Sequence, residues 1–210
     1  MDMKSIELVL MRHGSTLWNE QKRYLGHTDL GLSLLGRNEL VSARGKLKEM
    51  SFSSVYCSDL ARCRESLKEV RSDLVMEAVY DQRLREMDFG DWEGHTYEQL
   101  KDVPLYREWL NDPQGAAPPQ GESWSVFERR VDEFLQNMLQ AEKQKQTLDP
   151  ERPAMALVVA HGGVIRQIVH TLVPDQAFWD TRVEPGNLLV LTLERNGDTA
   201  DFQGRNLRYI

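Results

Sequence analysis

The sequence predicts an α/β fold in which a mostly parallel central sheet lies between two layers of helices, a three-layer sandwich. Two continuous apolar runs of strand length, residues 6–11 and 155–160, have the pattern of parallel strands that are covered on both faces. Helical patterns alternate with strand patterns through most of the chain, which favours parallel strands joined by helical crossovers. Residues 88–122, rich in turn formers, interrupt this alternation, and we expect a small helical insertion over the sheet edge.

The elements follow one another in a simple order. Residues 6–11 (IELVLM) form the first predicted strand, and the run 52–57 (FSSVYC) forms the second. Between them, apolar residues recur at helical spacing over 33–50, and a second helix is expected just after Ser58, which is placed to cap it. Four further segments are predicted: a long helix from about residue 123, a strand at 155–160, an apolar helix at 164–172 and a last strand at 188–193, before a polar terminal segment from residue 196.

Length and charge limit the class of protein. A chain of 210 residues fits one domain, residues 1–210, that carries the insertion at about 88–122. The 26 Lys and Arg residues against 33 Asp and Glu residues give a formal net charge of -7, which argues against a nucleic-acid-binding protein. An anion that this protein binds must therefore meet a local cluster of positive charge.

Two cysteines, Cys57 and Cys63, are too few for a disulfide framework and lack the spacing of a zinc site, so we expect free thiols. The first ten residues do not have the pattern of a secretory leader, and no run approaches the roughly 20 apolar residues that span a bilayer. We therefore expect a cytoplasmic protein with no membrane partner, either a monomer or a homodimer.

Two segments of the chain have the same pattern, in which a predicted buried strand is followed by His-Gly. They are LVLMRHG, which contains His13, and LVVAHGG, which contains His161. If both strands belong to one parallel sheet, both imidazoles emerge at its carboxyl edge, where sites in such folds lie. We therefore expect the two rings to face one site.

Arginines and one carboxylate complete the predicted site. Arg12 precedes His13, and Arg62 lies near the start of the helix after the second strand. The planar arginine fork suits phosphate because it donates two parallel hydrogen bonds and stays charged. Glu86 is a candidate general acid for the oxygen of a departing alcohol. Together these residues predict a site for a small phosphate ester.

Five motifs resemble the histidine phosphatase superfamily, also called the phosphoglycerate mutase-like family. They are LVLMRHGSTLWN, GHTDLGLSLLG, YCSDLARCRES, LREMDFGDWEG and VVAHGGVIR, and they extend over residues 8–19, 26–36, 56–66, 84–94 and 158–166. The resemblance runs from about residue 6 to residue 194 and implies the phosphoglycerate mutase-like fold. Ser15 departs from the family pattern, in which an acid is common at that position.

The resemblance also implies roles for individual residues. It makes His13 the phosphorylated nucleophile, Glu86 the proton donor and acceptor, and Arg12, Arg62 and a protonated His161 the phosphate pocket. Substrate binding is assigned to three further residues, Asn19, Gly26 and Gly162. Two in-line displacements through a phosphohistidine then need no metal and no cofactor.

Three segments point to one branch of the superfamily. MDFGDWEG, PPQGESW and FWDTRVEPGN, at residues 87–94, 118–124 and 178–187, are similar to alpha-ribazole-5'-phosphate phosphatases and related broad-specificity phosphatases. A phosphoglycerate mutase or a sugar-bisphosphate phosphatase would use the same pocket and is the alternative. A catalytically inactive module that binds a phosphorylated ligand is the remote alternative.

Overall fold

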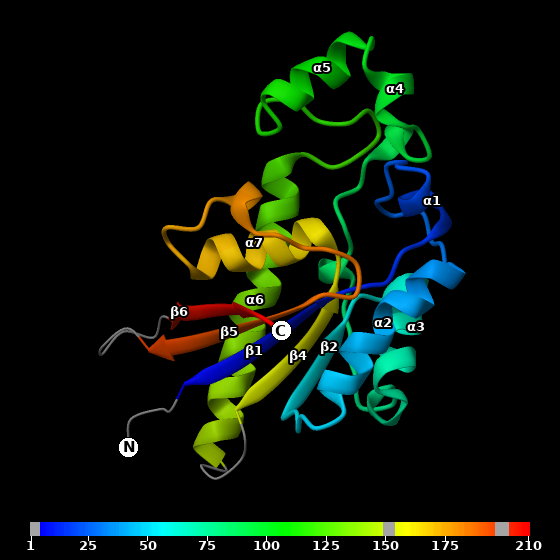
Figure 1. Ribbon diagram of the computed structural model, residues 1–210. Helices are drawn as coiled ribbons and strands as arrows, with labels where there is room; N and C mark the ends of the chain where they lie inside the picture. Colours follow the sequence, from blue (N-terminus) through cyan, green and yellow to red (C-terminus); the bar gives the residue numbers. More distant parts are fainter. Residues whose placement is uncertain (1–4, 149–153, 196–201) are drawn as a thin grey trace.

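The computed structural model describes residues 5–148, 154–195 and 202–210, and its strands form one six-stranded sheet in the order β3-β2-β4-β1-β5-β6 (Figure 1). The strands are β1 (Ile6–Arg12), β2 (Ser54–Cys57), β3 (Val79–Tyr80), β4 (Met155–Ala160), β5 (Leu188–Arg195) and β6 (Phe202–Tyr209). The first four strands run parallel to one another, whereas β5 pairs antiparallel with both β1 and β6. The prediction of a mostly parallel sheet is confirmed.

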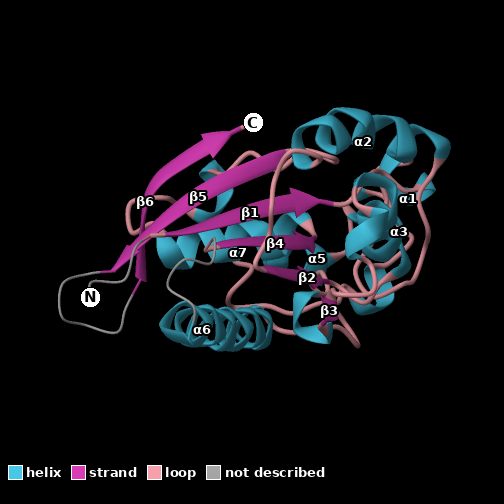
Figure 2. Cartoon of the chain, turned by 90° about the horizontal axis from the view of Figure 1, so that it is seen from below, coloured by secondary structure: helices cyan, strands magenta, loops and turns pink. Residues whose placement is uncertain are grey.

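Helices cover both faces of this sheet, as Figure 2 shows. The α-helices are α1 (Leu17–Glu20), α2 (Leu34–Leu47), α3 (Ala61–Val70), α4 (Tyr97–Leu100), α5 (Pro104–Asn111), α6 (Trp124–Leu148) and α7 (Gly162–Leu172). The helices α2 and α3 lie on one face, and α6 and α7 lie on the other. No helix within the described ranges is long and apolar enough to cross a membrane.

The middle of β1, from Leu8 to Met11, is apolar at every position because both of its faces are covered. Successive side chains of a strand point to opposite faces of the sheet. Leu8 and Leu10 therefore belong to the core under α6 and α7, while Val9 and Met11 belong to the core under α2 and α3. A strand segment that is covered on both faces needs an apolar residue at each position, whereas Glu7, near the start of β1, is partly exposed and pairs with Arg208.

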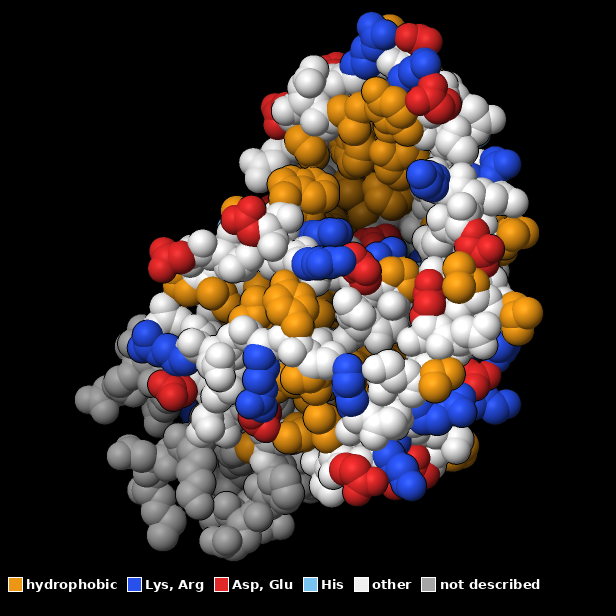
Figure 3. Space-filling model, in the orientation of Figure 1, with side chains coloured by type: hydrophobic (Ala, Val, Ile, Leu, Met, Phe, Trp, Pro, Cys, Tyr) orange, Lys and Arg blue, Asp and Glu red, His pale blue; other side chains and the backbone are white. Residues whose placement is uncertain are grey.

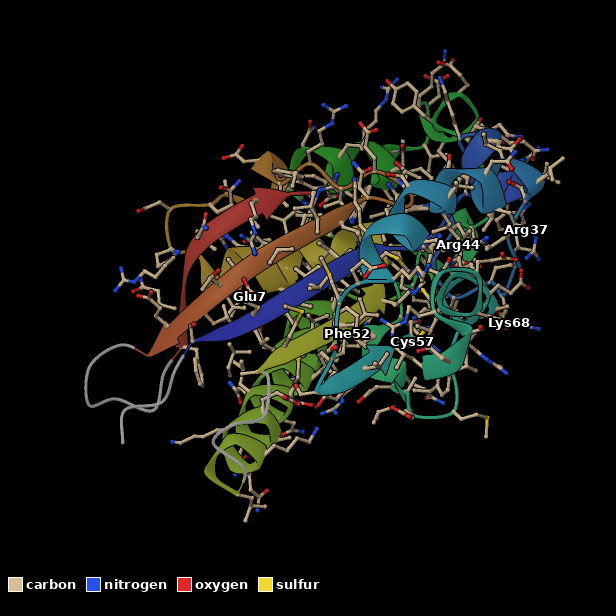
Figure 4. The ribbon with its side chains drawn as sticks, turned by 60° about the horizontal axis from the view of Figure 1, so that its bottom comes forward. Glu7, Arg37, Arg44, Phe52, Cys57 and Lys68 are labelled. Atoms are coloured by element: carbon tan, nitrogen blue, oxygen red, sulfur yellow. The ribbon has the colours of Figure 1, made fainter. Side chains whose placement is uncertain are left out.

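Ion pairs join α2 to α3 on the outer surface of their layer. Arg37 pairs with Glu65 and Glu69, and Arg44 also pairs with Glu69 (Figure 4). Exposed pairs of this kind contribute at most about 1 kcal/mol each. Apolar burial beneath them therefore dominates the packing of this layer.

Two strands were missing from the predicted order. The strand at residues 188–193 is not the last one, because β6 pairs with β5 along the edge of the sheet. Edge strands need no continuous apolar face, since backbone hydrogen bonds hold them to one neighbour and polar side chains protect the open edge. The short strand β3 has only two residues and is too short to show a period.

The helix start predicted at Ser58 was wrong. α3 begins at Ala61, and Leu60 at its N-cap makes no side-chain capping hydrogen bond. The Ser58 hydroxyl instead lies 2.9 Å from Nε2 of His161. A serine just before a helix carries the same local signal for either role, and only the tertiary partner decides between them.

The segment between the 3-10 helix Gln82–Leu84 and α6 contains the two short helices α4 and α5, which lie beyond the carboxyl edge of the sheet (Figure 1). Trp92, Tyr106 and Trp109 pack against one another at centroid distances of 5.2 to 6.1 Å. All three side chains are buried and belong to the core under α6 and α7. The segment therefore packs as part of that core.

Candidate active site

The register of β1 against β4 brings the two histidines together. Arg12 lies opposite Ala160, so the next residue on each strand, His13 and His161, leaves the sheet at the same edge. The backbone N–H of His13 donates to the Ala160 carbonyl at 3.1 Å. The centroids of the two buried imidazole rings are 5.0 Å apart.

One hydrogen bond selects the tautomer of His13. Its Nδ1 lies 2.7 Å from the carbonyl oxygen of Gly14, which can only accept a hydrogen bond. Nδ1 therefore carries the proton, and Nε2 keeps its lone pair. Burial, followed by the charges of Arg62 and Arg12, holds the pKa of His13 well below its usual range. The ring is therefore neutral at neutral pH, and the lone pair of Nε2 is available.

Two guanidinium groups flank the rings, Arg62 buried and Arg12 partly buried. Arg12 donates from Nη1 to the Val183 carbonyl at 2.7 Å, and its Nε is buried without a protein partner. Arg62 donates from Nη1 to the Thr28 carbonyl at 2.9 Å and from Nη2 to the Gly26 carbonyl at 2.6 Å. These bonds hold both forks in place, so the positive charge for an anion is preorganised.

His161 is held by hydrogen bonds on both sides of its ring. Nε of Arg62 donates to Nδ1 of His161 at 3.2 Å, so in the neutral ring Nε2 carries the proton and donates to Ser58. Burial and the charge of Arg62 lower the pKa of His161 well below its usual range. His161 is therefore a neutral ring in this structure, where the two arginines carry the positive charge, and its protonation around a bound phosphoryl group stays a prediction.

Glu86 reaches the site from the loop after the 3-10 helix Gln82–Leu84. Its Oε2 accepts from the backbone N–H of Gly163 at 3.0 Å, in the first turn of α7 beside His161. A Cβ on Gly163 would lie 2.4 Å from Oε1 of Glu86, so a larger residue there would displace the carboxylate from this position. The carboxylate is thus placed at the edge of the sheet that holds both histidines.

The three predicted substrate-binding residues have different surroundings. Oδ1 of Asn19 accepts from the backbone N–H of Thr16 at 3.0 Å and caps α1. Gly26 offers its carbonyl to Arg62, and a Cβ there would lie 2.2 Å from the Met87 carbonyl. Gly162 is the first residue of α7, next to His161. Their contact with a substrate remains a prediction.

Two residues that hold the loop after His13 were not predicted from the sequence. Ser66 accepts from the Gly14 backbone N–H at 3.1 Å. Glu39 accepts from the backbone N–H and the hydroxyl of Ser15, at 2.8 and 2.9 Å. Both hold the loop after His13 from neighbouring helices, α3 and α2. They lie far from the motif in the sequence, and no local pattern identifies them.

Within the described part of the chain, no group of three or more His, Cys, Asp or Glu side chains is placed to hold a metal ion. Cys63 is buried with its Sγ 3.5 Å from Nε2 of His161, and burial raises the pKa of this thiol to about 12. Cys57 is buried as well, and both cysteines are free.

The lowered pKa values of His13 and His161 predict that the protein loses stability in mild acid. In the unfolded chain each histidine binds a proton below a pKa of about 6.5, whereas in the fold both rings stay neutral. Stability is therefore complete above pH 6.5 and falls below it, by up to about 1.4 kcal/mol per pH unit for each ring. Urea unfolding at pH 7.5 and 5.5 in phosphate-free buffer measures this loss.

The double variant His13→Asn/His161→Asn should show a smaller loss between the two pH values. The control His170→Asn, at an exposed position of α7, should behave as the wild type does. Equal pH dependence in the wild type and the double variant would show that the two rings titrate normally.

Comparison with known proteins adds to this geometry. A family model described as "Histidine phosphatase superfamily (branch 1)" matches residues 8–206. The chain is 32% identical over 185 residues to the adenosylcobalamin/alpha-ribazole phosphatase of Escherichia coli, with 86% of this chain and 87% of the relative covered. It is 30% identical over 179 residues to phosphoglycerate mutase-like protein 4 of Arabidopsis thaliana, covering 83% and 74% of the two chains.

A solved structure has the same architecture. The alpha-ribazole phosphatase from Shigella flexneri superimposes with a TM-score of 0.77 at 29% identity, and 96% of each chain is covered. The likeness therefore extends over the sheet, both helical layers and the segment that contains α4 and α5.

Proposed function

This chain belongs to the histidine phosphatase superfamily and is a phosphatase of that superfamily, and from this premise we propose that His13 carries its catalytic phosphoryl group. The single observation that carries the proposal is the state of the His13 ring. Its Nδ1 is bound to the Gly14 carbonyl, which leaves Nε2 with its lone pair, and the ring lies beside His161 under the influence of the charges of Arg62 and Arg12. A phosphoryl dianion bound beside His13 would therefore meet both a nucleophile and fixed positive charge.

The first step of the proposed reaction transfers the phosphoryl group to His13. Nε2 forms a bond to phosphorus as the ester oxygen leaves on the opposite side, and Glu86 gives that oxygen a proton. Arg12 and Arg62 hold the charged equatorial oxygens, and the N-terminus of α7 adds the positive end of a helix dipole. The leaving group departs as a neutral alcohol.

The second step releases phosphate. Water attacks the phosphorus atom of phosphohistidine while the Glu86 carboxylate takes up one of its protons, and the N–P bond breaks. His13 returns to its neutral state with the proton still on Nδ1, bound to Gly14. One carboxylate thus serves as acid and then as base, and the enzyme ends as it began.

We propose alpha-ribazole 5'-phosphate, or a related small ester, as the substrate. Two relatives with this name cover most of the chain and support the choice. Figure 3 shows apolar side chains gathered in a hollow below α4 and α5, with basic and acidic side chains at its base. An apolar ring on the leaving alcohol suits such a hollow. The two free cysteines are compatible with a cytoplasmic setting.

A substrate panel tests this proposal. Purified protein in EDTA is given alpha-ribazole 5'-phosphate, 3-phosphoglycerate, fructose bisphosphate and p-nitrophenyl phosphate, and the products are identified. We expect release of inorganic phosphate, with the highest kcat/KM on alpha-ribazole 5'-phosphate. Activity should persist in EDTA, and vanadate should inhibit it, because arginines rather than a metal ion are proposed to hold the anion.

Other outcomes separate the alternatives. Movement of the phosphoryl group within 3-phosphoglycerate would identify a mutase, and preference for fructose bisphosphate would identify a sugar-bisphosphate phosphatase. Activity that disappears in EDTA and returns with a divalent ion would contradict the metal-free scheme. Turnover of any ester excludes an inactive binding module.

A further inference from the structure

The loop that carries Glu86 is held by a guanidinium group outside the phosphate pocket. Arg130, on α6, has five N–H groups, and each one meets an acceptor. Nη1 donates to the Arg83 and Arg85 carbonyls at 2.8 and 2.6 Å, and Nη2 donates to the Glu86 carbonyl at 2.8 Å. Nε and the remaining Nη2 hydrogen go to the two carboxylate oxygens of Glu122.

Glu122 extends this contact to the other side of Glu86. Its Oε1 accepts from the backbone N–H of Asp88 at 2.9 Å, and its own backbone N–H donates to the Asp88 carbonyl at 3.0 Å. The side chains of Arg130 and Glu122 are 16% and 11% exposed, so solvent competes little for these bonds. The pair therefore fixes the backbone both before and after the proposed acid.

We propose that Arg130, supported by Glu122, is a positioning residue that sets the place of the Glu86 carboxylate for proton transfer. The inference rests on the proposed role of Glu86. Proton donation requires hydrogen-bond reach to the leaving oxygen, and a shift of about 1 Å at such a group costs on the order of 100-fold in rate. Among the described residues, the Glu86 carboxylate accepts from two backbone donors, Met87 and Gly163, so the position of its backbone controls its direction.

Geometry, rather than charge, makes arginine necessary at this position. Three carbonyls and one carboxylate surround the plane of the guanidinium group, and a lysine ammonium offers three hydrogens from a single point. The variant Arg130→Lys therefore keeps the positive charge and loses the fork. Since Arg130 makes no hydrogen bond to His13, Arg12 or Arg62, the affinity for the phosphoryl group should be retained.

The experiment compares two leaving groups in Arg130→Lys. Glycerol phosphate releases an alkoxide that needs a proton, whereas p-nitrophenyl phosphate releases a stable phenolate. We expect kcat/KM to fall by about tenfold or more for glycerol phosphate and by less than about threefold for p-nitrophenyl phosphate. The inhibition constant of inorganic phosphate should stay within about twofold, because the phosphate pocket is untouched. The control Arg129→Lys, at the exposed neighbouring position, should match the wild type on both substrates.

A double variant tests whether Arg130 acts through Glu86. With Glu86→Gln already in place, adding Arg130→Lys should cause no further loss on glycerol phosphate, since no proton donor remains to be positioned. Equal losses on both substrates in Arg130→Lys, or a second full loss in the double variant, would overturn the inference. If Glu86→Gln alone keeps full activity on glycerol phosphate, the proposed role of Glu86 fails instead.

Thermal unfolding shows whether Arg130→Lys is folded. If it is not, Glu122→Gln provides the same test from the other half of the pair, because the amide nitrogen of glutamine cannot accept from Arg130 or Asp88. This variant should show the same selective loss on glycerol phosphate, of smaller size. Unchanged selectivity in a folded Glu122→Gln would then overturn the inference.

Discussion

Replacing His13 with alanine is expected to abolish turnover, with kcat falling by at least about 10⁴-fold. The variant keeps both arginines and Glu86 and loses the nitrogen that is proposed to attack phosphorus. Its substrate affinity should change far less than its rate, because Arg12 and Arg62, the proposed phosphate ligands, are held by backbone carbonyls and not by His13. Steady-state kinetics with p-nitrophenyl phosphate measures both quantities.

Trapping the phosphorylated intermediate provides a second test of the same variant. Wild-type protein quenched during turnover of a ³²P-labelled ester should contain an acid-labile, base-stable phosphoryl group, as expected of phosphohistidine, and His13→Ala should contain none. His170→Ala is the matched control, since His170 is an exposed histidine of α7. Labelling that persists in His13→Ala would identify a different nucleophile.

Replacing Glu86 with glutamine is expected to have the second largest effect, and this effect depends on the leaving group. For glycerol phosphate, kcat/KM should fall by about 10² to 10³-fold, the usual contribution of a general acid. For p-nitrophenyl phosphate it should fall much less, because the phenolate leaves without a proton. The glutamine side chain can still accept from Gly163 through its carbonyl oxygen, so the loop should keep its position.

The matched control for this variant is Glu108→Gln, which changes an exposed carboxylate of α5. It should leave kcat/KM unchanged for both esters. A Glu86→Gln protein that loses equal activity on both esters would show that the carboxylate contributes to binding or folding rather than to proton transfer.

The neutral state of His161 alters the electrostatics that the family resemblance implies. In this structure its Nδ1 accepts from Arg62 and its Nε2 faces Ser58, so the neutral ring orients Arg62. The positive charge that faces an anion therefore belongs to groups that cannot lose their protons at neutral pH. An anion bound between the two arginines would raise the pKa of both histidines, which links phosphate binding to proton uptake.

Local patterns alone were sufficient for the elements that carry the site. The apolar runs of β1 and β4 and the His-Gly pair after each of them are visible in the sequence because a buried parallel strand needs apolar residues on both faces. The edge strand β6 and the two-residue strand β3 were missed because backbone pairing, rather than an apolar pattern, holds them.

By itself the sequence determined the fold class and the residues that meet at the site, His13, His161, Arg12, Arg62 and Glu86, since each lies at a motif with a recognisable local pattern. Only the tertiary structure decided the proton positions on the rings and the supports of the acid. The neutral rings depend on burial and on nearby arginines, and the contacts of Ser58 and Arg130 join residues 103 and 44 to 47 positions apart. Such partners leave no periodic trace in the chain, because a hydrogen bond across the fold depends on distance in space and not on spacing in the sequence.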